Sequence, residues 1–251
     1  MKNRAFSLVE ILVATATVLV LGATETGAGW KAYGKSSLAV SANNIRQLAA
    51  GGTAYLADNN YIFWPFKRAD PDRNAFWWYG FETFASIKQA EGMRTFDPEQ
   101  GPLGGYVPKA IRPDPSFAFT GKAFKPKYRN GYLGIGYNVL LGGKWQWDND
   151  VKSLVNYWEL TAPSQVVVFF TSAQVNTFQA PASSKNPMIE EFYGIDEKEK
   201  TVHFRHAGLA MVGFANGSAG FLPMDETTRD PRAPTANVGR FAPINSKKYL
   251  E

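Results

Sequence analysis

The sequence predicts an α+β protein: a long N-terminal α-helix, membrane-spanning in its first half, packed on a mostly antiparallel β-sheet head. Two observations predict this class. An apolar run from Phe6 to Ala23 follows two positive charges, Lys2 and Arg4. Strand-like runs dominate the chain from about residue 131 onward, and one of them ends at Asn216-Gly217, a dipeptide that favours a hairpin.

Composition limits what the chain can be. Its 251 residues suffice for one good-sized domain plus the helix. Cysteine is absent, which excludes disulfides and thiolate metal sites, while 18 Phe, 11 Tyr and 7 Trp suit a β-rich exported domain with large packed side chains. The net charge of +5 is too small and too scattered to indicate a nucleic-acid partner.

Residues 6–23 are predicted to form a transmembrane or filament-core helix behind a leader of residues 1–5. A helix of this length spans about 27 Å, close to the roughly 30 Å hydrocarbon core of a bilayer. The flanking positive charges stay on the cytoplasmic side, so the remainder of the chain is expected outside the cytoplasm.

Glu10 is the single charge within this run. A carboxylate in an apolar membrane segment is unfavourable, so it needs a partner. Cleavage between Ala5 and Phe6 would create one, a new α-amino group four residues before Glu10. The alternative is an ordinary secretory signal peptide cut after a small residue such as Ala28, but a glutamate inside the apolar core of such a peptide argues against it.

A short basic leader, a small residue and then Phe6-Ser-Leu-Val-Glu10 with a long apolar run resembles the processing signal of type IV pilins and of the pseudopilins of type II secretion. The resemblance implies that prepilin peptidase cuts after Ala5 and that Phe6 becomes N-methylated. It also implies that Glu10 is the acidic residue at position five of the mature chain. The new amine of Phe6 could meet Glu10 within one helix, at i, i+4 spacing, or between two staggered helices, and in a filament Glu10 is expected to pair with Phe6 of a neighbouring copy. The family more often has Gly before the cut, where this chain has Ala5.

Residues 24–58 are predicted to continue as an amphipathic helix. Leu38, Ile45, Leu48 and Tyr55 recur at helical spacings, polar residues fill the other face, and Asp58-Asn59-Asn60 ends the pattern. The segment 43–48, Asn-Asn-Ile-Arg-Gln-Leu, followed by Tyr55 and Asp58-Asn59, resembles the second half of the long helix in pseudopilin-like proteins.

Residues 59–251 are predicted to form a globular β-rich head. Its first part, 61–130, is expected to be the least regular, with aromatic clusters such as 76–79 that either fill the core or form an exposed patch for a sugar or partner subunit. A small group of cations in this part either resembles a nucleic-acid contact or is a set of solvated loop cations: Lys122, Lys125, Lys127 and Arg129. The chain from Pro223 to Glu251 is polar and Pro-containing, which predicts a surface tail.

His206 and Asn216-Gly217 form a structural motif. Asn-Gly between two strand-like runs favours a type I′ hairpin. His206, nine residues and Asn216-Gly217 resemble the C-terminal His-x9-Asp-Gly signature of the pseudopilin group, with Asn216 in place of the Asp.

No catalytic residues and no metal site are predicted. On a strand, the side chains of His203 and His206 would point to opposite faces, and no third ligand has a suggestive spacing. The pair therefore does not indicate a zinc site. Calcium is the single cofactor for which residues can be named, and its oxygen ligands would be Asp225, Glu226 and Asp230. The chain also has no nucleophile elbow and no phosphate-binding loop, which argues against an enzyme.

The predicted function is therefore that of a pilin-like structural subunit of a type IV pilus-like or type II secretion pseudopilus filament. The expected partners are further copies, other pilin-like subunits, prepilin peptidase, the inner membrane and, indirectly, an assembly ATPase and platform. The expected location is the inner membrane, single-pass with a periplasmic head, and then a periplasmic or extracellular filament. The alternative is a membrane-tethered binding module for polysaccharide or DNA that forms no fibres.

Overall fold

The computed structural model describes residues 37–107, 114, 116–117, 123–129, 134–142, 154–195 and 200–241. The chain divides into two compact units, Met1–Ala39 and Val40–Glu251. The predicted leader and the predicted membrane segment, residues 6–23, lie outside the described residues. Within the described part of the chain, no helix combines the length and the apolar character needed to cross a bilayer.

The longest described helix covers residues 37–58. Ile45 and Leu56, both on its apolar stripe, are almost fully buried in the core of the second unit. The helix stops where Asn60 takes a positive φ of 54°, because the Tyr61 N–H then donates to the Leu56 carbonyl at 2.8 Å and closes the last turn. The polar stretch that the sequence marks as the end of the helix is thus its C-terminal cap.

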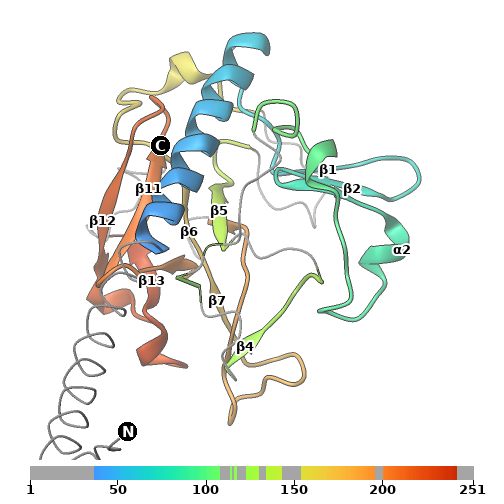
Figure 1. Ribbon diagram of the computed structural model, residues 1–251, viewed down its shortest axis with the longest axis vertical. Coiled ribbons are helices and arrows are strands. Elements are labelled where there is room, and N and C mark those ends of the chain that lie inside the picture. The colour runs from blue at the N-terminus through green and yellow to red at the C-terminus, as the bar shows by residue number, and fades with distance from the viewer. Residues whose placement is uncertain are drawn as a thin grey trace, which may run out of the picture. The chain divides into compact units, whose positions relative to one another are not determined.

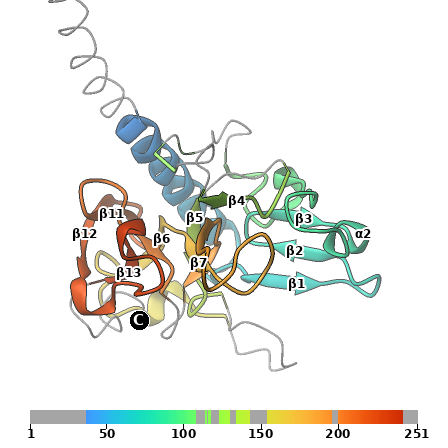
Figure 2. The same cartoon turned by 90° about the horizontal axis from the view of Figure 1, so that it is seen from below.

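A seven-stranded sheet forms the centre of the second unit, in the order β10-β13-β12-β11-β6-β5-β9. Its strands are β5 (Ile135–Asn138), β6 (Val167–Thr171), β9 (Gly194–Ile195), β10 (Val202–His203), β11 (Leu209–Phe214), β12 (Ala219–Asp225) and β13 (Val238–Phe241). Beyond the end of β6, Ser172 bridges to Val202 of β10, and the Ala173 N–H donates to the Thr201 carbonyl at 3.1 Å. The sheet therefore curls into a near-barrel, with β6, β11, β12 and β13 running around a common centre (Figure 2).

The two faces of this sheet bury different cores. The curl encloses an apolar group made of Val167, Phe170, Ile195, Val202, Phe204, Ala210, Val212, Met224 and Phe241. Phe169 and Met211, neighbours of these residues on β6 and β11, point to the other face and join Ile45 and Trp64 in a larger core. On β11 this division follows from the alternation of side chains along a strand, whereas on β6 a register shift opposite Gly213 and Phe214 places Val167 and Phe170 on the same face. The helix lies along that outer face (Figure 1).

Two smaller three-stranded sheets flank the central one. The first has the order β1-β2-β3, and the second has the order β4-β8-β7. Their elements, together with the short helices of the described chain, are β1 (Lys67–Ala69), β2 (Ala75–Trp77), β3 (Gly80–Glu82), α2 (Phe84–Ile87), η1 (Pro98–Gln100), β4 (Phe124–Lys125), η2 (Tyr157–Glu159), β7 (Gln174–Asn176), β8 (Met188–Glu190), η3 (Glu226–Thr228) and η4 (Pro234–Ala236). Among all described strand pairs, only β4 with β8 and β5 with β9 are parallel.

The predicted α+β class is wrong. The described residues are mostly β, with thirteen strands against two α-helices, 37–58 and the single turn α2. The described residues do not show a long helix with a membrane-spanning half on a sheet, and residues 61–130, expected to be irregular, contain β1 to β4. Their strands have two or three residues each, too few to produce a recognisable alternation of apolar and polar positions.

The C-terminal stretch also differs from its prediction. Residues expected to form a surface tail instead supply β13, which lies between β10 and β12 in the central sheet. Val238 and Phe241 are completely buried, and Phe241 belongs to the core inside the curl. In the sequence, these two apolar positions are hard to recognise among the surrounding Pro, Thr, Asp and Arg residues. Val238 and Phe241 nevertheless decide where the segment packs.

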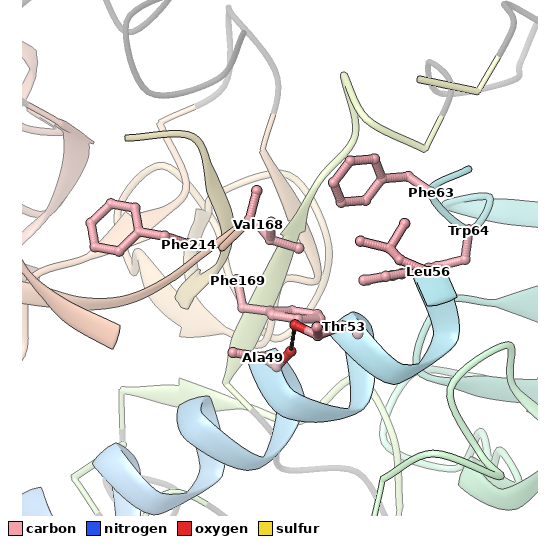
Figure 3. A pocket seen from close by; sticks show the side chains of 10 residues that line it. Ala49, Thr53, Leu56, Phe63, Trp64, Val168, Phe169 and Phe214 are labelled. Carbon is pink, nitrogen blue, oxygen red and sulfur yellow. Dashed lines mark hydrogen bonds between the residues drawn. The ribbon is translucent and has the colours of Figure 1, made fainter. Parts of the chain in front are cut away.

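The helix approaches the outer face of the sheet closely at Gly52. A Cβ atom at this position would lie 2.8 Å from the Trp64 ring and 3.5 Å from the Phe169 ring. Ala49, Thr53 and Leu56 point from the helix towards the same rings around a residual cavity of about 10 Å³ (Figure 3). Packing at this seam leaves no room for a side chain, which explains a helix-disfavouring glycine there.

Replacing Gly52 with valine is expected to lower the free energy of unfolding by about 1–3 kcal/mol, because overpacking displaces Trp64. Urea unfolding followed by tryptophan fluorescence measures the change. Gly105→Ala is the matched control, since a Cβ atom there meets nothing within 4 Å. A Gly52→Val midpoint equal to that of the wild type would contradict the close approach.

Candidate functional site

The predicted processing residue Ala5 and the predicted assembly residues Phe6 and Glu10 lie outside the described residues. The predicted structural motif is described. His206 and Asn216-Gly217 occupy two turns at opposite ends of β11, which spans residues 209–214. A strand of this length separates the turns by about 20 Å, so the structure does not bring the two parts of the motif together.

His206 begins a tight turn. Its N–H and carbonyl exchange hydrogen bonds with Leu209 at 3.1 and 3.0 Å, while Ala207 and Gly208 have φ values of 53° and 80°. Two consecutive positive φ values are the signature of a type I′ turn. Burial and the nearby Arg205 guanidinium lower the pKa of His206 to about 4, and its Nε2 atom has no hydrogen-bond partner among the described residues.

Asn216 and Gly217 close the hairpin between β11 and β12, but not in the predicted turn type. Gly217 has a φ of 84°, whereas Asn216 does not have a positive φ. The Gly217 N–H donates to the Phe214 carbonyl at 2.9 Å, and the Phe214 N–H donates to the Ser218 carbonyl at 2.8 Å. This is a three-residue loop with glycine in the left-handed region, and the type I′ turn of this part of the chain lies at His206 instead.

The three acidic residues named for calcium are engaged separately. Asp225 caps η3 by accepting from the Thr227 N–H at 3.0 Å, Glu226 pairs with Arg229 at 2.6 Å, and Asp230 pairs with Arg232 at 2.6 Å. The described residues contain no group of three or more histidine, cysteine or acidic side chains placed to hold a metal ion. The structure does not bring these carboxylates together.

An ion pair between Asp114 and Arg205 connects three distant parts of the second unit. The Arg205 guanidinium donates to Asp114 Oδ2 at 2.5 and 3.1 Å and to the Gly134 carbonyl at 2.7 Å. Oδ1 of Asp114 accepts from Ser41 of the helix at 2.5 Å. Burial alone would raise the pKa of Asp114, but Arg205 and the two serine hydroxyls at 41 and 116 bring it down to about 2.

His203 lies beside this pair. Its Nδ1 atom is 3.1 Å from Arg205 Nη1, and burial followed by the charge of Arg205 lowers its pKa well below the ordinary histidine value. The neutral, buried imidazole of His203 contacts the Arg205 guanidinium and so helps to hold it beside Asp114. Because its pKa is lowered, His203 does not exchange protons near neutral pH.

A cavity of about 370 Å³ lies between the β1-β2-β3 sheet and the residues that follow β4 and β8. We call it the Trp77 pocket, and its principal lining residues are Lys67, Trp77, Arg94, Lys127, Tyr128 and Tyr193. Its volume falls within the range of roughly 300–1,000 Å³ that is typical of small-molecule sites.

Buried carboxylates hold two of its three cations. Glu82, fully buried, accepts from Arg94 Nε at 2.8 Å and Nη2 at 2.7 Å, and also from the Tyr128 hydroxyl at 3.1 Å. The Lys127 ammonium lies 2.9 Å from Glu190 Oε1. Arg94 and Lys127 are therefore already neutralised.

Ion pairs of this kind also decide between the two interpretations of the cation group in residues 122–129. Lys125 is buried and pairs with Glu91 and, at 3.1 Å, with Glu190. Together with Lys127, it forms buried ion pairs, so the interpretation as solvated loop cations is wrong for these two residues. The same pairs also oppose a nucleic-acid contact there. Lys122 lies outside the described residues.

Glu190 and Glu191 are adjacent carboxyls in opposite states. Burial alone would raise the pKa of Glu190, but Lys127, Asn176 and Lys125 hold it below its usual value. Glu191 accepts from the Lys127 N–H through one oxygen, and its Oε1 atom is buried with no hydrogen-bond partner among the described residues. Burial raises the pKa of Glu191 to about 8, so this side chain is mostly protonated at neutral pH.

The sequence did not indicate Lys67, Glu82, Arg94, Asp114 or Arg205. The available signals were the aromatic cluster 76–79 and the cation group 122–129, which both supply lining residues of this pocket. Of this cluster, Trp78 and Tyr79 are buried in the main core, in agreement with the core alternative.

Comparisons with protein-family models, curated proteins and solved structures find no match to this chain.

Proposed function

We propose that this protein is a pilin-like structural subunit, cleaved after Ala5 and assembled into a type IV pilus-like or type II secretion pseudopilus filament. One observation carries the proposal. Glu10 is the single charge in the apolar run of residues 6–23, and it stands at a fixed short distance behind a basic leader. A charge in that position is tolerated when it has a partner, and cleavage at Ala5 supplies an amine.

Assembly follows from the same chemistry. Apolar segments from many copies pack together, and the carboxylate of Glu10 on one copy pairs with the amine of Phe6 on a neighbour. Repeated contacts between different surfaces of identical subunits generate open filaments rather than closed rings. A copy in the wrong register leaves a buried charge unpaired, so this pair selects the register.

The β-rich second unit, Val40–Glu251, supports a role as the part of each subunit exposed on the fibre. It has separate hydrophobic cores on the two faces of its central sheet and the buried ion pairs described above, so it can remain folded while its N-terminal segment is held among neighbours. In the expected topology it lies outside the cytoplasm, where a chain without cysteine depends on packing and ion pairs for its stability.

Replacing Glu10 with leucine is expected to leave the protein inserted in the membrane and to reduce fibre yield to a small fraction of the wild-type value. Shearing cells and quantifying the subunit in the sheared and membrane fractions measures both quantities. Ile11→Leu, which changes shape in the same segment but not charge, is the control and should retain fibres.

Normal fibre yield from the Glu10→Leu variant would contradict this mechanism. A subunit present in sheared fibres at only a few copies would indicate a tip or priming role within the same class. The complete absence of fibres in the wild type, together with binding of polysaccharide or DNA, would favour the membrane-tethered binding module instead.

A further inference from the structure

The Trp77 pocket has one positive charge that the described residues do not balance. Glu82 neutralises Arg94 and Glu190 neutralises Lys127, whereas Lys67 forms no ion pair with any described residue. The Lys67 ammonium instead lies 4.7 Å from the centre of the Trp77 ring. A half-buried ammonium over an aromatic face is partly desolvated, which is an unfavourable state that a bound anion would relieve.

A second unpartnered polar group belongs to the same wall. Tyr193 lines the pocket with 4% of its surface exposed, and its hydroxyl is buried without a hydrogen-bond partner among the described residues. Tyr193 stacks on Tyr79 at a centroid distance of 4.2 Å, and Tyr79 stacks in turn near Trp77 at 5.8 Å. The ring stack fixes the Tyr193 side chain in the wall of the pocket.

The shape and charge of the pocket limit its ligand. Most of the wall is apolar or aromatic, so the body of a ligand should be flat and ring-sized. Only one cation is unbalanced, so a single negative charge is matched, whereas a doubly or triply charged phosphate would face the buried carboxylates Glu82 and Glu190 with an excess of negative charge.

We propose that the Trp77 pocket binds a small monoanion, a carboxylate carried on a six-membered ring, with Lys67 as the counter-ion. This chemistry is shared by aromatic acids and by uronic acid sugars. Binding requires only the folded second unit, so it does not depend on cleavage after Ala5 or on filament formation.

Isothermal titration calorimetry on the detergent-solubilised full chain at pH 7 tests the proposal. The probes are benzoate and glucuronate, with benzyl alcohol and glucose as their uncharged counterparts, each at concentrations up to about 20 mM, where a millimolar Kd is measurable. We expect at least one of the acids to bind and its uncharged counterpart to bind about tenfold more weakly. The acid that binds identifies the source of the ligand, aromatic or sugar.

Lys67→Met removes the charge but keeps most of the side-chain stem, and it should weaken binding of that acid about tenfold. Arg68→Met is the matched control, because Arg68 is the next residue of β1, is exposed, and lies over Phe76 on the other face of the strand. It should leave the affinity unchanged. If Lys67→Met shifts the urea midpoint, Lys67→Gln, which also removes the charge but keeps a polar end group, replaces it as the deciding variant, with the same loss of affinity expected.

Four results would overturn the proposal. The folded wild type could bind neither acid, or it could bind the uncharged counterparts as tightly as the acids. The deciding variant could also bind with the same affinity as the wild type, or Arg68→Met could weaken binding equally, which would indicate a general attraction to positive charge.

Discussion

Replacing Asp114 with asparagine is expected to lower the free energy of unfolding by about 3–5 kcal/mol, the usual result of breaking one partner from a buried ion pair. The Arg205 side chain is 3% exposed, so the variant leaves a guanidinium charge in the interior without its carboxylate. Asparagine has one acceptor oxygen where the carboxylate has two, so it cannot accept from both Ser41 and Arg205 as Asp114 does. Urea unfolding of the detergent-solubilised chain, followed by the fluorescence of buried Trp64 and Trp78, measures the loss.

Glu226→Gln is the control for Asp114→Asn, because it removes the same charge from the exposed pair with Arg229. Glu226 is 67% exposed in its side chain, so this substitution should change stability by less than about 1 kcal/mol. Equal effects of the two substitutions would show that Asp114 is not the buried anchor that the geometry indicates.

The ion pair of Asp114 with Arg205 also sets a lower pH limit for the stability of the fold. Its folded pKa of about 2 lies below the unfolded value of 3.8, so its contribution to stability is complete above about pH 4 and disappears as the pH falls towards 2. His206 acts in the same direction at higher pH. Its folded pKa of about 4 is below the unfolded value of 6.5, so protonation of the unfolded chain removes stability as the pH falls between these two values.

Replacing Glu191 with glutamine is expected to stabilise the protein at pH 8–9 by several kcal/mol, about 3–5. The folded pKa of Glu191 is about 8 and its unfolded pKa is 4.5, so between these values the folded state holds a proton that the unfolded state releases. The stability that this group contributes is complete below about pH 4.5 and is lost as the pH rises through 8. Glutamine is neutral in both states and removes this loss.

The difference between the unfolding free energies of the Glu191→Gln variant and the wild type, measured from pH 4.5 to 9, isolates this effect. It should be near zero at pH 4.5 and should grow towards pH 8. Glu190→Gln is the contrasting neighbour, since it breaks the pairs with Lys125 and Lys127 and should destabilise the protein at pH 7. Parallel pH curves for the wild type and Glu191→Gln would contradict the buried neutral acid.

The elements that the sequence predicted are those with long, regular patterns. The apolar run in residues 165–170 forms β6, and the two runs around Asn216-Gly217 pair as β11 and β12. The predicted turn type was wrong because Asn-Gly fits two kinds of loop. In a two-residue type I′ loop both residues have a positive φ, whereas in the observed three-residue loop Gly217 alone does. The strands β1 to β3 were missed because three residues give no measurable period.

The buried charges could not be paired from the sequence. Asp114 and Arg205 are 91 positions apart, and Lys125 and Glu190 are 65 positions apart, so their contacts depend on how the sheets are stacked. Isolated Lys and Arg residues among loops are usually solvated, which made the ordinary interpretation the wrong one for Lys125. The Trp77 pocket depends on the same long-range stacking, because its walls come from β1, β2 and the residues after β4 and β8.

The N-terminal residue of the mature protein tests the central claim most directly. Mass spectrometry of the N-terminal peptide from the native membrane or sheared fibre fraction identifies it. The pilin-like account predicts a chain that starts at Phe6 with a methylated α-amino group. A chain that starts near Gly29, after removal of the whole apolar run, would contradict it.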